Sequence, residues 1–506
     1  MAEAFSAVGL ILQWENLILA LIGFLVGCIG GAIPGIGGPL TLTLMMPFVL
    51  PLSTEASMIT LIAAYSGLAY AGSVPAILMN TPGSPGSAAA AFDGYPMAKR
   101  GEGVTAISIS AAASGFGSIL GALFLIALSP VLVRFVLLFG SVEYFMLAVL
   151  GLSTIVMVSG RSVVKGLIAA VLGCLVAAIG TTTIRAFPRF SLGVPELYDG
   201  INLVAAFIGV FAIGEMLRLS GLHGTSIAEV LAATGSRIRG IRLMLAEWRI
   251  ALKTGILGVL LGAVPGQGAT VTNFLSYAEA RRSSKNPEEY GNGAPGGIVA
   301  VDSSNNAVIG GSLVPTLAFG IPGSGTTAIL LVALLLSGIR PGPNMFDEDI
   351  ILTYTMIGAV MMGGILSFTV GVLLAKQFSL VTIVPNTFLI PVVTIVSMLG
   401  AYVISYRHTM VWQALVFGVI GYVLIRHNFP IIAFILGLIL GPLAELNLVR
   451  TYQISGGNVP MIFVQRPVSL VLVLMTVFVL VWPPLAPIVK ARRLARQKAR
   501  PEPSAV

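Results

Sequence analysis

An apolar stretch that contains helix-breaking residues constrains the fold of this chain more than any other feature. Residues 27–51, GCIGGAIPGIGGPLTLTLMMPFVLP, are hydrophobic enough for a lipid bilayer. Pro34 lacks a backbone donor and clashes with the preceding turn, and the glycines after it lower the cost of non-helical dihedral angles. The sequence therefore predicts a helix that breaks at membrane depth. Lipid cannot satisfy the freed N–H and C=O groups, so the break must be buried in protein or line a wet cavity, as a binding site does.

This motif occurs twice, and so does a second motif that follows it. The first is GAIPGIG at 31–37 and GAVPGQG at 262–268, and the second is PAILMNTPGS at 75–84 and PTLAFGIPGS at 315–324. From the first motif proline to the second, the interval is 48 residues in one half and 57 in the other, and the polar insertion 281–293 accounts for the difference. A chain with 59 glycines and 29 prolines produces short coincidences by chance. Two motifs in the same order at near-equal spacing favour an internal duplication instead.

We predict two repeat halves joined by a basic connector. The expected divisions are a first half at 1–220 with motifs at 31–38 and 75–87, a connector at 221–248, a second half at 249–445 with motifs at 262–269 and 315–326, a loop and last span at 446–489, and a basic tail at 490–506. Repeats of inverted topology are common in transporters with broken helices, so we expect inversion here. The connector and the tail should both be cytoplasmic by the positive-inside rule.

Composition indicates a membrane protein. Of 506 residues, 56% are hydrophobic and 9% are charged, and windows such as 108–128 approach the roughly 20 apolar residues that cross a bilayer. We expect an all-α polytopic membrane protein with about 11 to 12 transmembrane helices and additional re-entrant pieces. The formal charge of +8 does not indicate nucleic-acid binding, because the basic residues gather at span ends and in the tail.

Helices that begin inside the membrane predict where a ligand binds. Their first turns present free N–H groups and a partial positive charge of about half a unit, which attract an anion. Each of the four motifs is followed by such a start, so we expect these starts to converge on one site. The predicted substrate-binding residues are Gly35, Gly37, Asn80, Thr81, Gly83, Ser84, Gly266, Gln267, Gly268, Gly323, Ser324 and Thr326. Helix capping is the alternative role for each of the polar ones.

A polar run, DSSNN at 302–306, interrupts an apolar segment of the second half. Such a run is costly in a membrane unless it faces partners or a cavity. Asp302, Asn305 and Asn306 are the predicted ion-binding residues, because their oxygens suit a small cation such as Na⁺ and a carboxylate can also carry a proton. A loop at the membrane interface is the alternative.

Catalytic signatures are absent from the sequence. It contains no HExxH, GxSxG or GxxxxGK(S/T) motif, so metalloprotease, serine hydrolase and ATPase activities are not indicated. Cys28 and Cys174 lie in apolar runs without a neighbouring His or Cys, which argues against a metal centre or a disulfide. We expect neither an enzyme nor a bound cofactor, apart from Na⁺ as a possible coupling ion.

The chain resembles the large membrane subunit of the tripartite tricarboxylate transporters, the TctA family. The resemblance covers nearly the whole chain and rests on GAIPGIGG, NTPGSPGSAAAAFDGYPMAKRGEG, GAVPGQGA, DSSNNA and FGIPGSGTTAILL. It implies a bacterial inner-membrane location and two partners: a small four-span membrane subunit (TctB-like) and a periplasmic solute-binding protein (TctC-like). One departure is visible. A pattern such as PESANNA is expected here, whereas this chain has Val301 and Asp302, which weakens an ion-coupling role for the acid.

The sequence thus predicts a permease subunit that imports di- or tricarboxylates by symport with Na⁺ or H⁺, as the resemblance implies. An anion channel, or an exporter of another small organic anion, is the alternative, because the same helix ends would serve it equally well.

Overall fold

The computed structural model is a bundle of helices. It describes residues 2–34, 36–136, 138–155, 162–181, 187–221, 234–264, 268–381, 386–404 and 406–480. The expectation of an all-α polytopic membrane protein is confirmed, with one two-stranded antiparallel pair, β1 (Gly180–Thr181) and β2 (Pro188–Arg189), as the strand structure of the described residues. Several predicted features lie outside the described residues, namely Gly35, Gly266, Gln267, residues 222–233 of the connector and the tail 490–506.

The helices follow one another along the chain in two comparable series. The first comprises α1 (Ala2–Ile11), α2 (Trp14–Ala32), α3 (Gly37–Val49), α4 (Thr54–Ala71), α5 (Ser73–Met79), η1 (Pro85–Ala90), α6 (Ala91–Lys99), α7 (Gly103–Val136), α8 (Ser141–Ser153), α10 (Val163–Ala177), η2 (Pro195–Leu197), α11 (Leu203–Phe207), η3 (Ile208–Ile213) and α12 (Gly214–Ser220). The second comprises α13 (Arg237–Ala246), α14 (Trp248–Gly262), α15 (Gly268–Ser283), η4 (Pro287–Glu289), α16 (Pro295–Phe319), α17 (Gly325–Leu336), η5 (Pro343–Phe346), α18 (Ile350–Leu366), η6 (Ser367–Gly371), α19 (Ala375–Val381), α20 (Asn386–Val403), α21 (His408–Arg426), α22 (Ile431–Ile454) and α23 (Val459–Gln465).

Glycines on α2 bring this helix into backbone contact with α4. Gly23, Gly27 and Gly31 lie one turn apart, and a Cβ atom at Gly27 would be 2.0 Å from the carbonyl oxygen of Ala64. At Gly31 the same atom would be 2.5 Å from the carbonyl oxygen of Leu68. The contacts advance by four residues along both helices, so α2 and α4 run in the same direction. The chain must therefore return between them, and α3, which follows the break at Pro34, is the segment that returns.

The second half repeats this arrangement. A Cβ atom at Gly258 of α14 would be 2.5 Å from the carbonyl oxygen of Ser304, and one at Gly262 would be 2.9 Å from that of Val308. Thus α14 and α16 also run in the same direction, with α15 between them in the chain. Small residues permit such close approach of helices within a membrane, where packing rather than hydrophobicity drives association.

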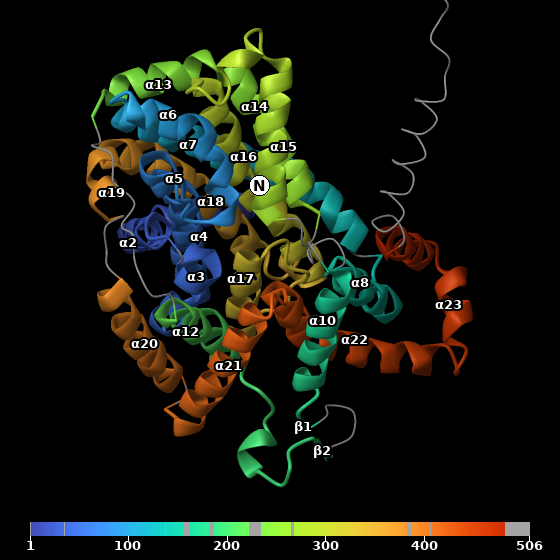
Figure 1. Cartoon of the computed structure of the whole chain (residues 1–506). Coiled ribbons are helices and arrows are strands. Elements are labelled where there is room, and N and C mark those ends of the chain that lie inside the picture. The colour runs from blue at the N-terminus through green and yellow to red at the C-terminus, as the bar shows by residue number, and fades with distance from the viewer. Residues whose placement is uncertain are drawn as a thin grey trace, which may run out of the picture.

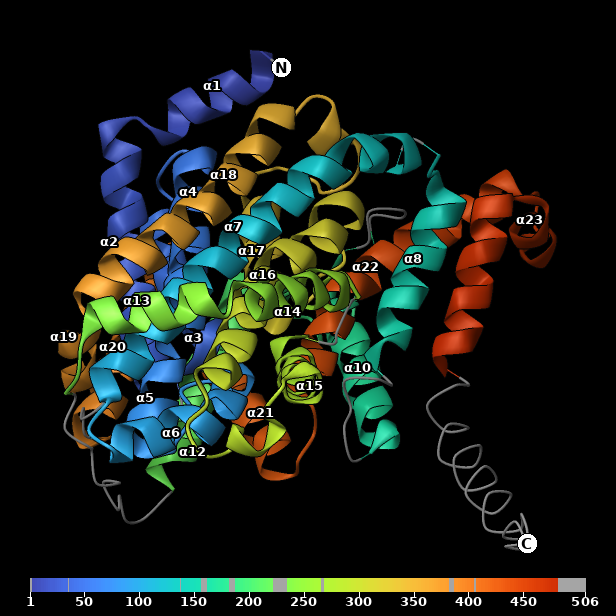
Figure 2. The same cartoon turned by 90° about the horizontal axis from the view of Figure 1, so that it is seen from above.

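Corresponding helices also pack across the two halves. From the first half, α7 lies along α16, η1 contacts α15 and α10 lies along α22. From the second half, the corresponding helices do the same: α18 lies along α4, α17 contacts α3, and α21 lies along η3 and α12. Figures 1 and 2 show α10, α22 and α23 on one side of the bundle and α2, α19 and α20 on the other. The repeated pairing agrees with the predicted duplication, while the inverted orientation of the repeats stays a prediction.

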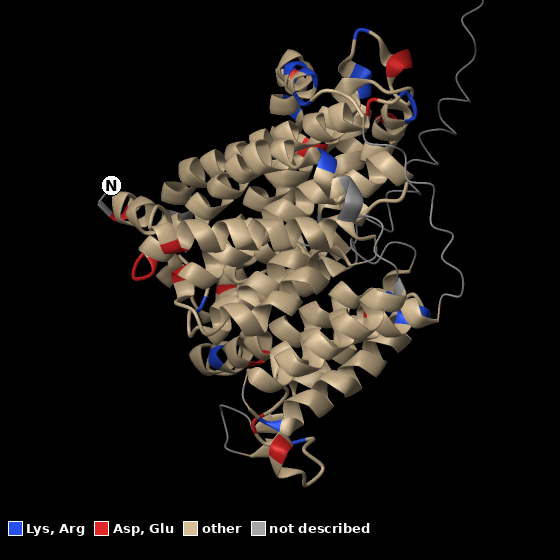
Figure 3. Ribbon diagram, turned by 90° about the vertical axis from the view of Figure 1, so that its left-hand side faces the viewer, with Lys and Arg blue, Asp and Glu red and all other residues tan. Residues whose placement is uncertain are grey.

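The expected number of spans is too high by the criteria of length and composition. Within the described residues seven helices are long and apolar enough to cross a membrane, or eight if the bent pair Val459–Gln465 and Pro467–Leu480 is one span. Five further apolar helices are only 10 to 17 residues long. Among them, α3 and α17 begin at the Pro-Gly motifs and are too short to cross a bilayer alone, which fits the additional re-entrant pieces of the prediction. Charged residues lie mainly at the outer ends of the helices and in the loops (Figure 3).

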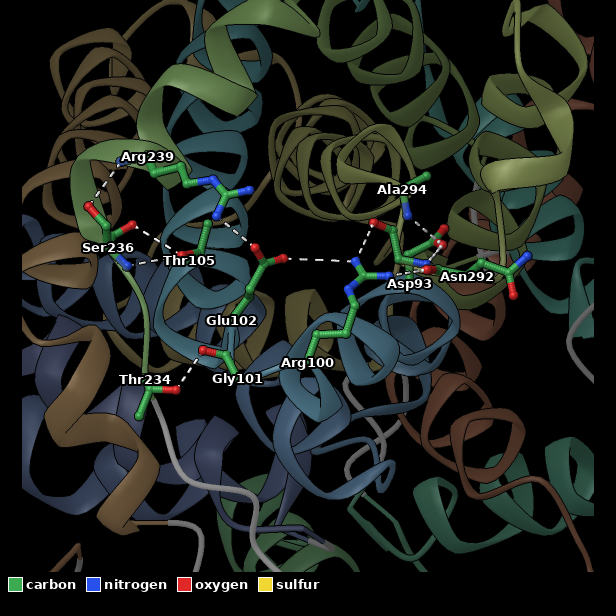
Figure 4. A network of polar contacts seen from close by, with 11 residues as sticks. Asp93, Arg100, Gly101, Glu102, Thr105, Thr234, Ser236, Arg239, Asn292 and Ala294 are labelled. Atoms are coloured by element: carbon green, nitrogen blue, oxygen red, sulfur yellow. Dashed lines mark hydrogen bonds and ion pairs between the residues drawn. The ribbon is translucent and has the colours of Figure 1, made fainter.

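A network of charged and polar groups holds the loop after α6 against the loop before α16 (Figure 4). Asp93 of α6 is fully buried, and its Oδ1 atom accepts hydrogen bonds from the backbone N–H groups of Gly291, Gly293 and Ala294 at 2.8 to 2.9 Å. Arg100 donates to the carbonyl oxygens of Asn292 and Gly293. The network therefore joins the first half to the second.

The same network reaches the connector. Arg239 of α13 forms an ion pair with Glu102 at 2.7 Å, and the Thr105 hydroxyl accepts a hydrogen bond from the Ser236 N–H at 3.0 Å. Helix α13 also packs against α7. Arg100 and Arg239 thus take part in contacts between segments, beyond any role in membrane orientation.

We predict that Gly27→Ala destabilises the protein whereas Gly9→Ala does not. The added methyl group at position 27 would overlap the Ala64 carbonyl and force α2 from α4, at a cost of about 1–3 kcal/mol. At Gly9 of α1 nothing lies within 4 Å of the added atom, so only the higher helix propensity of Ala acts there. Thermal unfolding in detergent, followed by size-exclusion chromatography, compares the two variants. Equal melting temperatures would contradict the close packing.

We predict that Asp93→Asn loosens the loop before α16. The substitution keeps the shape of the side chain but removes the charge that strengthens its three backbone hydrogen bonds, at a cost of about 1–3 kcal/mol. Hydrogen exchange at Gly291, Gly293 and Ala294 should become faster. Asp199→Asn is the matched control, because the Asp199–Arg407 pair is largely exposed and surface pairs contribute little. Unchanged exchange in Asp93→Asn would show that the charge has no part in holding the loop.

Candidate functional site

The four Pro-Gly interruptions come together at the junction of the two halves. A Cβ atom at Gly38, at the start of α3, would lie 2.4 Å from the Thr326 hydroxyl oxygen at the start of α17. A Cβ atom at Gly86 of η1 would lie 3.0 Å from the Cβ atom of Ala269 at the start of α15. Each interrupted segment therefore contacts one from the other half, as a site at a repeat interface requires.

The motif prolines do not face lipid as simple kinks. Pro322 is buried, and Pro34 and Pro82 are partly buried. The fourth, Pro265, lies outside the described residues. At the three positions that the structure describes, the interruptions are therefore at least partly covered by protein, which reduces the cost of unpaired backbone groups in lipid.

The second motif of each half packs onto a long central helix through glycine. A Cβ atom at Gly83 would lie 2.0 Å from the Gly31 carbonyl oxygen, and the Gly83 N–H donates to the Gly72 carbonyl at 3.0 Å. At Gly323 the added atom would lie 2.6 Å from the Cβ atom of Ser312 in α16. A larger residue at either position would push the motif away from the helix.

Two polar contacts cross between the halves beside these motifs. The Tyr65 hydroxyl of α4 lies 3.3 Å from the Ser324 hydroxyl, where α17 begins. On the other side, the Asn273 amide of α15 donates to the Asn305 Oδ1 atom at 2.9 Å and to the Gly86 carbonyl at 2.7 Å. The Asn305 amide donates in turn to the Ala69 carbonyl of α4 at 2.8 Å. Both contacts join a central helix of one half to a motif or helix of the other.

The predicted ion-binding residues lie in the middle of α16 and not in an interfacial loop. Helix α16 is continuous from Pro295 to Phe319, and Asp302, Asn305 and Asn306 are all buried in it. The Ser73 hydroxyl donates to Asp302 Oδ1 at 2.5 Å. Asp302 Oδ2 and both polar side-chain atoms of Asn306 have no hydrogen-bond partner among the described residues. The loop alternative is therefore wrong.

A hollow of about 570 Å³ opens beside the first Pro-Gly break. Its wall includes Ile36, Pro39 and Leu40 at the start of α3, Pro85 of η1, and the residues from Asn428 to Ile432 that lead into α22. Gly325, the first residue of α17, lies behind this wall, because its Cβ position is within 3.5 Å of Pro39 and Ile432. The starts of α3 and α22 thus direct the positive ends of two helix dipoles toward the hollow.

One carboxylate also lines this hollow, and it is already paired. Glu215 of α12 forms an ion pair with Arg218 at 2.5 Å, three residues later on the same helix. A second hollow of about 450 Å³ lies between α8, α17 and α22, but its wall is mostly Leu, Ile, Phe and Pro, with Arg340 as its charged residue. The walls of both hollows are mostly apolar, but the starts of α3 and α22 line the hollow at α3, which makes it the better candidate for an anion.

The predicted polar residues mostly serve the local structure of the motifs. Ser324 caps α17 by accepting from the Thr327 N–H at 3.1 Å, and Ser84 occupies the corresponding capping position of η1. Asn80 is exposed and ends α5 with φ of 53°, and the Thr81 hydroxyl donates to the Met79 carbonyl. For these side chains the capping alternative describes what the structure shows, and the groups that a helix start leaves free are backbone N–H groups.

The glycines of the predicted set lie at helix starts or tight contacts. Gly37 begins α3 with φ of 64°, a left-handed conformation that other residues rarely adopt, and Gly268 begins α15. Thr326 is buried against Gly38. These positions are consistent with a site formed by backbone, while the assignment of substrate contacts to these residues stays a prediction.

Sequence reasoning missed Tyr65, Ser73 and the Glu215–Arg218 pair as parts of this region. The repeat could have identified Tyr65 as the counterpart of Asn305, because these two residues are separated by the same number of residues as Pro82 and Pro322. Aligning the halves at the second motif therefore pairs Tyr65 with Asn305, and each of them makes a contact across the halves, Tyr65 with Ser324 and Asn305 with Ala69. No motif precedes α22, so its start could not be found in this way.

Comparison with known proteins agrees with this geometry. The family model described as the tripartite tricarboxylate transporter TctA family matches residues 17–436. An uncharacterized 52.8 kDa protein in the TAR-I ttuC' 3' region of Agrobacterium vitis is 34% identical over 458 residues, which cover 90% of each chain. A second uncharacterized protein, in the TAR-II ttuC' 3' region of the same organism, is 34% identical over 212 residues, 42% of this chain and 87% of its own length. No solved structure matches the chain. The chain therefore belongs to the tripartite tricarboxylate transporter TctA family and is a multi-pass membrane component of such a transporter.

Proposed function

We propose that this chain is the large permease subunit that imports di- or tricarboxylates across the bacterial inner membrane by symport with a cation. Its partners in this proposal are a small four-span membrane subunit and a periplasmic solute-binding protein that delivers the substrate. The basic tail lies in the cytoplasm. Membership of the family supports the tripartite assembly, and the hollow beside α3 supports an anionic substrate.

The observation that carries the proposal is the meeting of helix starts at the hollow. Each helix N-terminus favours an anion by about 0.3–1 kcal/mol at a surface and by up to about 2 kcal/mol when partly buried. The starts of α3 and α22 line the hollow and that of α17 lies behind its wall, so their contributions add at one place. Arg218, three residues from the lining residue Glu215, is paired with it, and Arg426, next to the lining residue Ile425, donates to the Tyr422 hydroxyl. Backbone dipoles and N–H groups, rather than a free Arg or Lys, therefore bind the carboxylate.

The contacts between the halves give this site a way to alternate. Tyr65 meets Ser324 on one side, and on the other side Asn273 donates to the Gly86 carbonyl and Asn305 donates to the Ala69 carbonyl, so each contact is one or two hydrogen bonds. A hydrogen bond contributes about 0.5–1.5 kcal/mol net, so either contact can be broken and remade in a transport cycle. Rocking of one repeat against the other would then open the hollow to the two sides in turn.

Uptake in proteoliposomes tests the proposed function. The chain is reconstituted with its small membrane subunit, the binding protein is added outside, and labelled di- and tricarboxylates are supplied with an imposed Na⁺ or proton gradient. We expect accumulation against the substrate gradient that requires both the binding protein and the ion gradient. Flux that only follows the substrate gradient would indicate an anion channel, and net export would indicate the opposite direction.

Asn305→Ala should reduce uptake while membrane abundance stays normal. The substitution leaves the Ala69 carbonyl and one Asn273 donor without this partner, and an unsatisfied buried group costs about 1–3 kcal/mol, or roughly 5- to 150-fold in an equilibrium. Asn447→Ala is the matched control, because Asn447 is equally buried but donates only to Leu443 in its own helix. Uptake that falls equally in both variants would show a general packing effect and would remove Asn305 from the transport cycle.

A further inference from the structure

A line of buried polar groups without partners lies between α7 and α16, away from the hollow. Asp302 Oδ2, both polar atoms of Asn306 and the hydroxyl oxygens of Ser110, Ser114 and Ser118 are all buried and have no hydrogen-bond partner among the described residues. All five side chains are fully buried. Nearly all buried polar groups in proteins are satisfied, and a single orphan costs about 1–3 kcal/mol, so such a concentration calls for a ligand.

The packing of the two helices brings these groups face to face. A Cβ atom at Gly117 of α7 would lie 2.1 Å from the Ser303 carbonyl oxygen, and one at Gly121 would lie 3.1 Å from that of Ala307. The contacts advance by four residues on both helices, so α7 and α16 run in the same direction. The facing sides of the two helices therefore stay in register from one turn to the next.

This register pairs the serines with the acid and the amide. Ser110 lies beside the Asp302 carboxylate. One turn later along each helix, Ser114 and Asn306 stand in the same relation to each other as Ser110 and Asp302, because the two helices run in the same direction and residues four apart share a helix face. Ser73 of α5 closes the cluster from a third helix by donating to Asp302 Oδ1. Ser118 continues the line toward α18, where its Cβ atom is 2.9 Å from a Cβ position at Gly364.

Asn305 does not belong to this cluster. Successive residues of an α-helix point about 100° apart, so Asn305 and Asn306 face different neighbours. Both ends of the Asn305 amide are already bonded, to Ala69 and to Asn273. Asn305 is thus part of the contact between the halves, whereas Asp302 and Asn306 face α7.

We propose that Asp302, Asn306, Ser110 and Ser114 bind one monovalent cation of the size of Na⁺, which is the coupling ion of the symport proposed above. Only the role of this ion in coupling rests on the proposed function. The binding site itself does not depend on it. The cluster contains one carboxylate and no ion pair to it occurs among the described residues, so one positive charge neutralises it. A divalent ion would leave a buried net charge, which is costly.

The chemistry of the ligands favours a hard cation over a transition metal or a proton. Carboxylate, amide and hydroxyl oxygens suit hard cations, and no group of three His, Cys, Asp or Glu residues that could hold a metal occurs within the described residues. A proton would satisfy Asp302 alone. The Asn306 and serine oxygens would remain unpaired, so protonation does not explain why they gather there.

The test measures Na⁺ binding directly on the purified full-length chain. Equilibrium binding of ²²Na⁺, and thermal stabilisation by NaCl relative to choline chloride at constant ionic strength, are recorded for the wild type, Asp302→Asn and Ser114→Ala. We expect saturable binding by the wild type. Loss of a group that merely supports a metal site weakens binding by about 10- to 100-fold, so the two variants should lose at least as much. Ser108→Ala is the matched control: Ser108 is equally buried on α7, but its hydroxyl bonds to Val104 in its own helix.

The outcomes separate this site from the proposed function. Saturable Na⁺ binding that Asp302→Asn and Ser114→Ala weaken and Ser108→Ala does not supports the site, even if no carboxylate is imported, in which case the proposed function fails alone. Wild-type protein that binds no Na⁺, or variants that bind it as well as the wild type, overturn the site. Carboxylate uptake driven only by a proton gradient overturns the coupling role while import stands. Asp302→Asn keeps the shape of the side chain. If Asp302→Asn nevertheless does not fold, Ser114→Ala tests the site independently.

Discussion

The structure depends on the requirement that backbone N–H and C=O groups find partners inside the protein when they lie within a membrane. A helix that breaks at Pro34 or Pro322 frees such groups where lipid offers none. The chain meets the requirement with glycine, because Gly27 and Gly31 let α4 lie against α2 and Gly83 lets its motif reach Gly31. Enclosure of the breaks and close glycine packing are therefore two aspects of one constraint.

This constraint also explains why the halves are interlocked. Each break exposes a helix start that needs surrounding protein, and part of this cover comes from a break of the other half, as Gly38 against Thr326 shows. Long helices then cross over to complete the enclosure, with α7 along α16 and α18 along α4. Neither half would bury its own breaks alone, so the site forms only where the two meet.

The sequence allowed the helical membrane class, the position of the breaks and their convergence to be predicted, because Pro and Gly act locally and the repeat doubles the signal. It did not allow the number of spans to be predicted, since hydropathy cannot distinguish a crossing from a piece that turns back. It also missed the role of Asp93. The charges near Asp93 cancel in the sequence, but its carboxylate lies against backbone that is about 200 residues away in the chain. Such partners depend on tertiary packing, which no local pattern records.

Helix α16 places two kinds of contact on neighbouring residues, and this arrangement is suited to coupling. Asn305 joins the second half to the first through the Ala69 carbonyl, while Asn306 and Asp302 face α7. A ligand can shift a conformational equilibrium only by its differential affinity for the two states. A cation held between α7 and α16 would stabilise the state in which these helices keep their register, and α16 is too rigid to move one face without the other. The state of the ion would therefore alter the contact that Asn305 makes on the adjacent face, which is the linkage that symport requires.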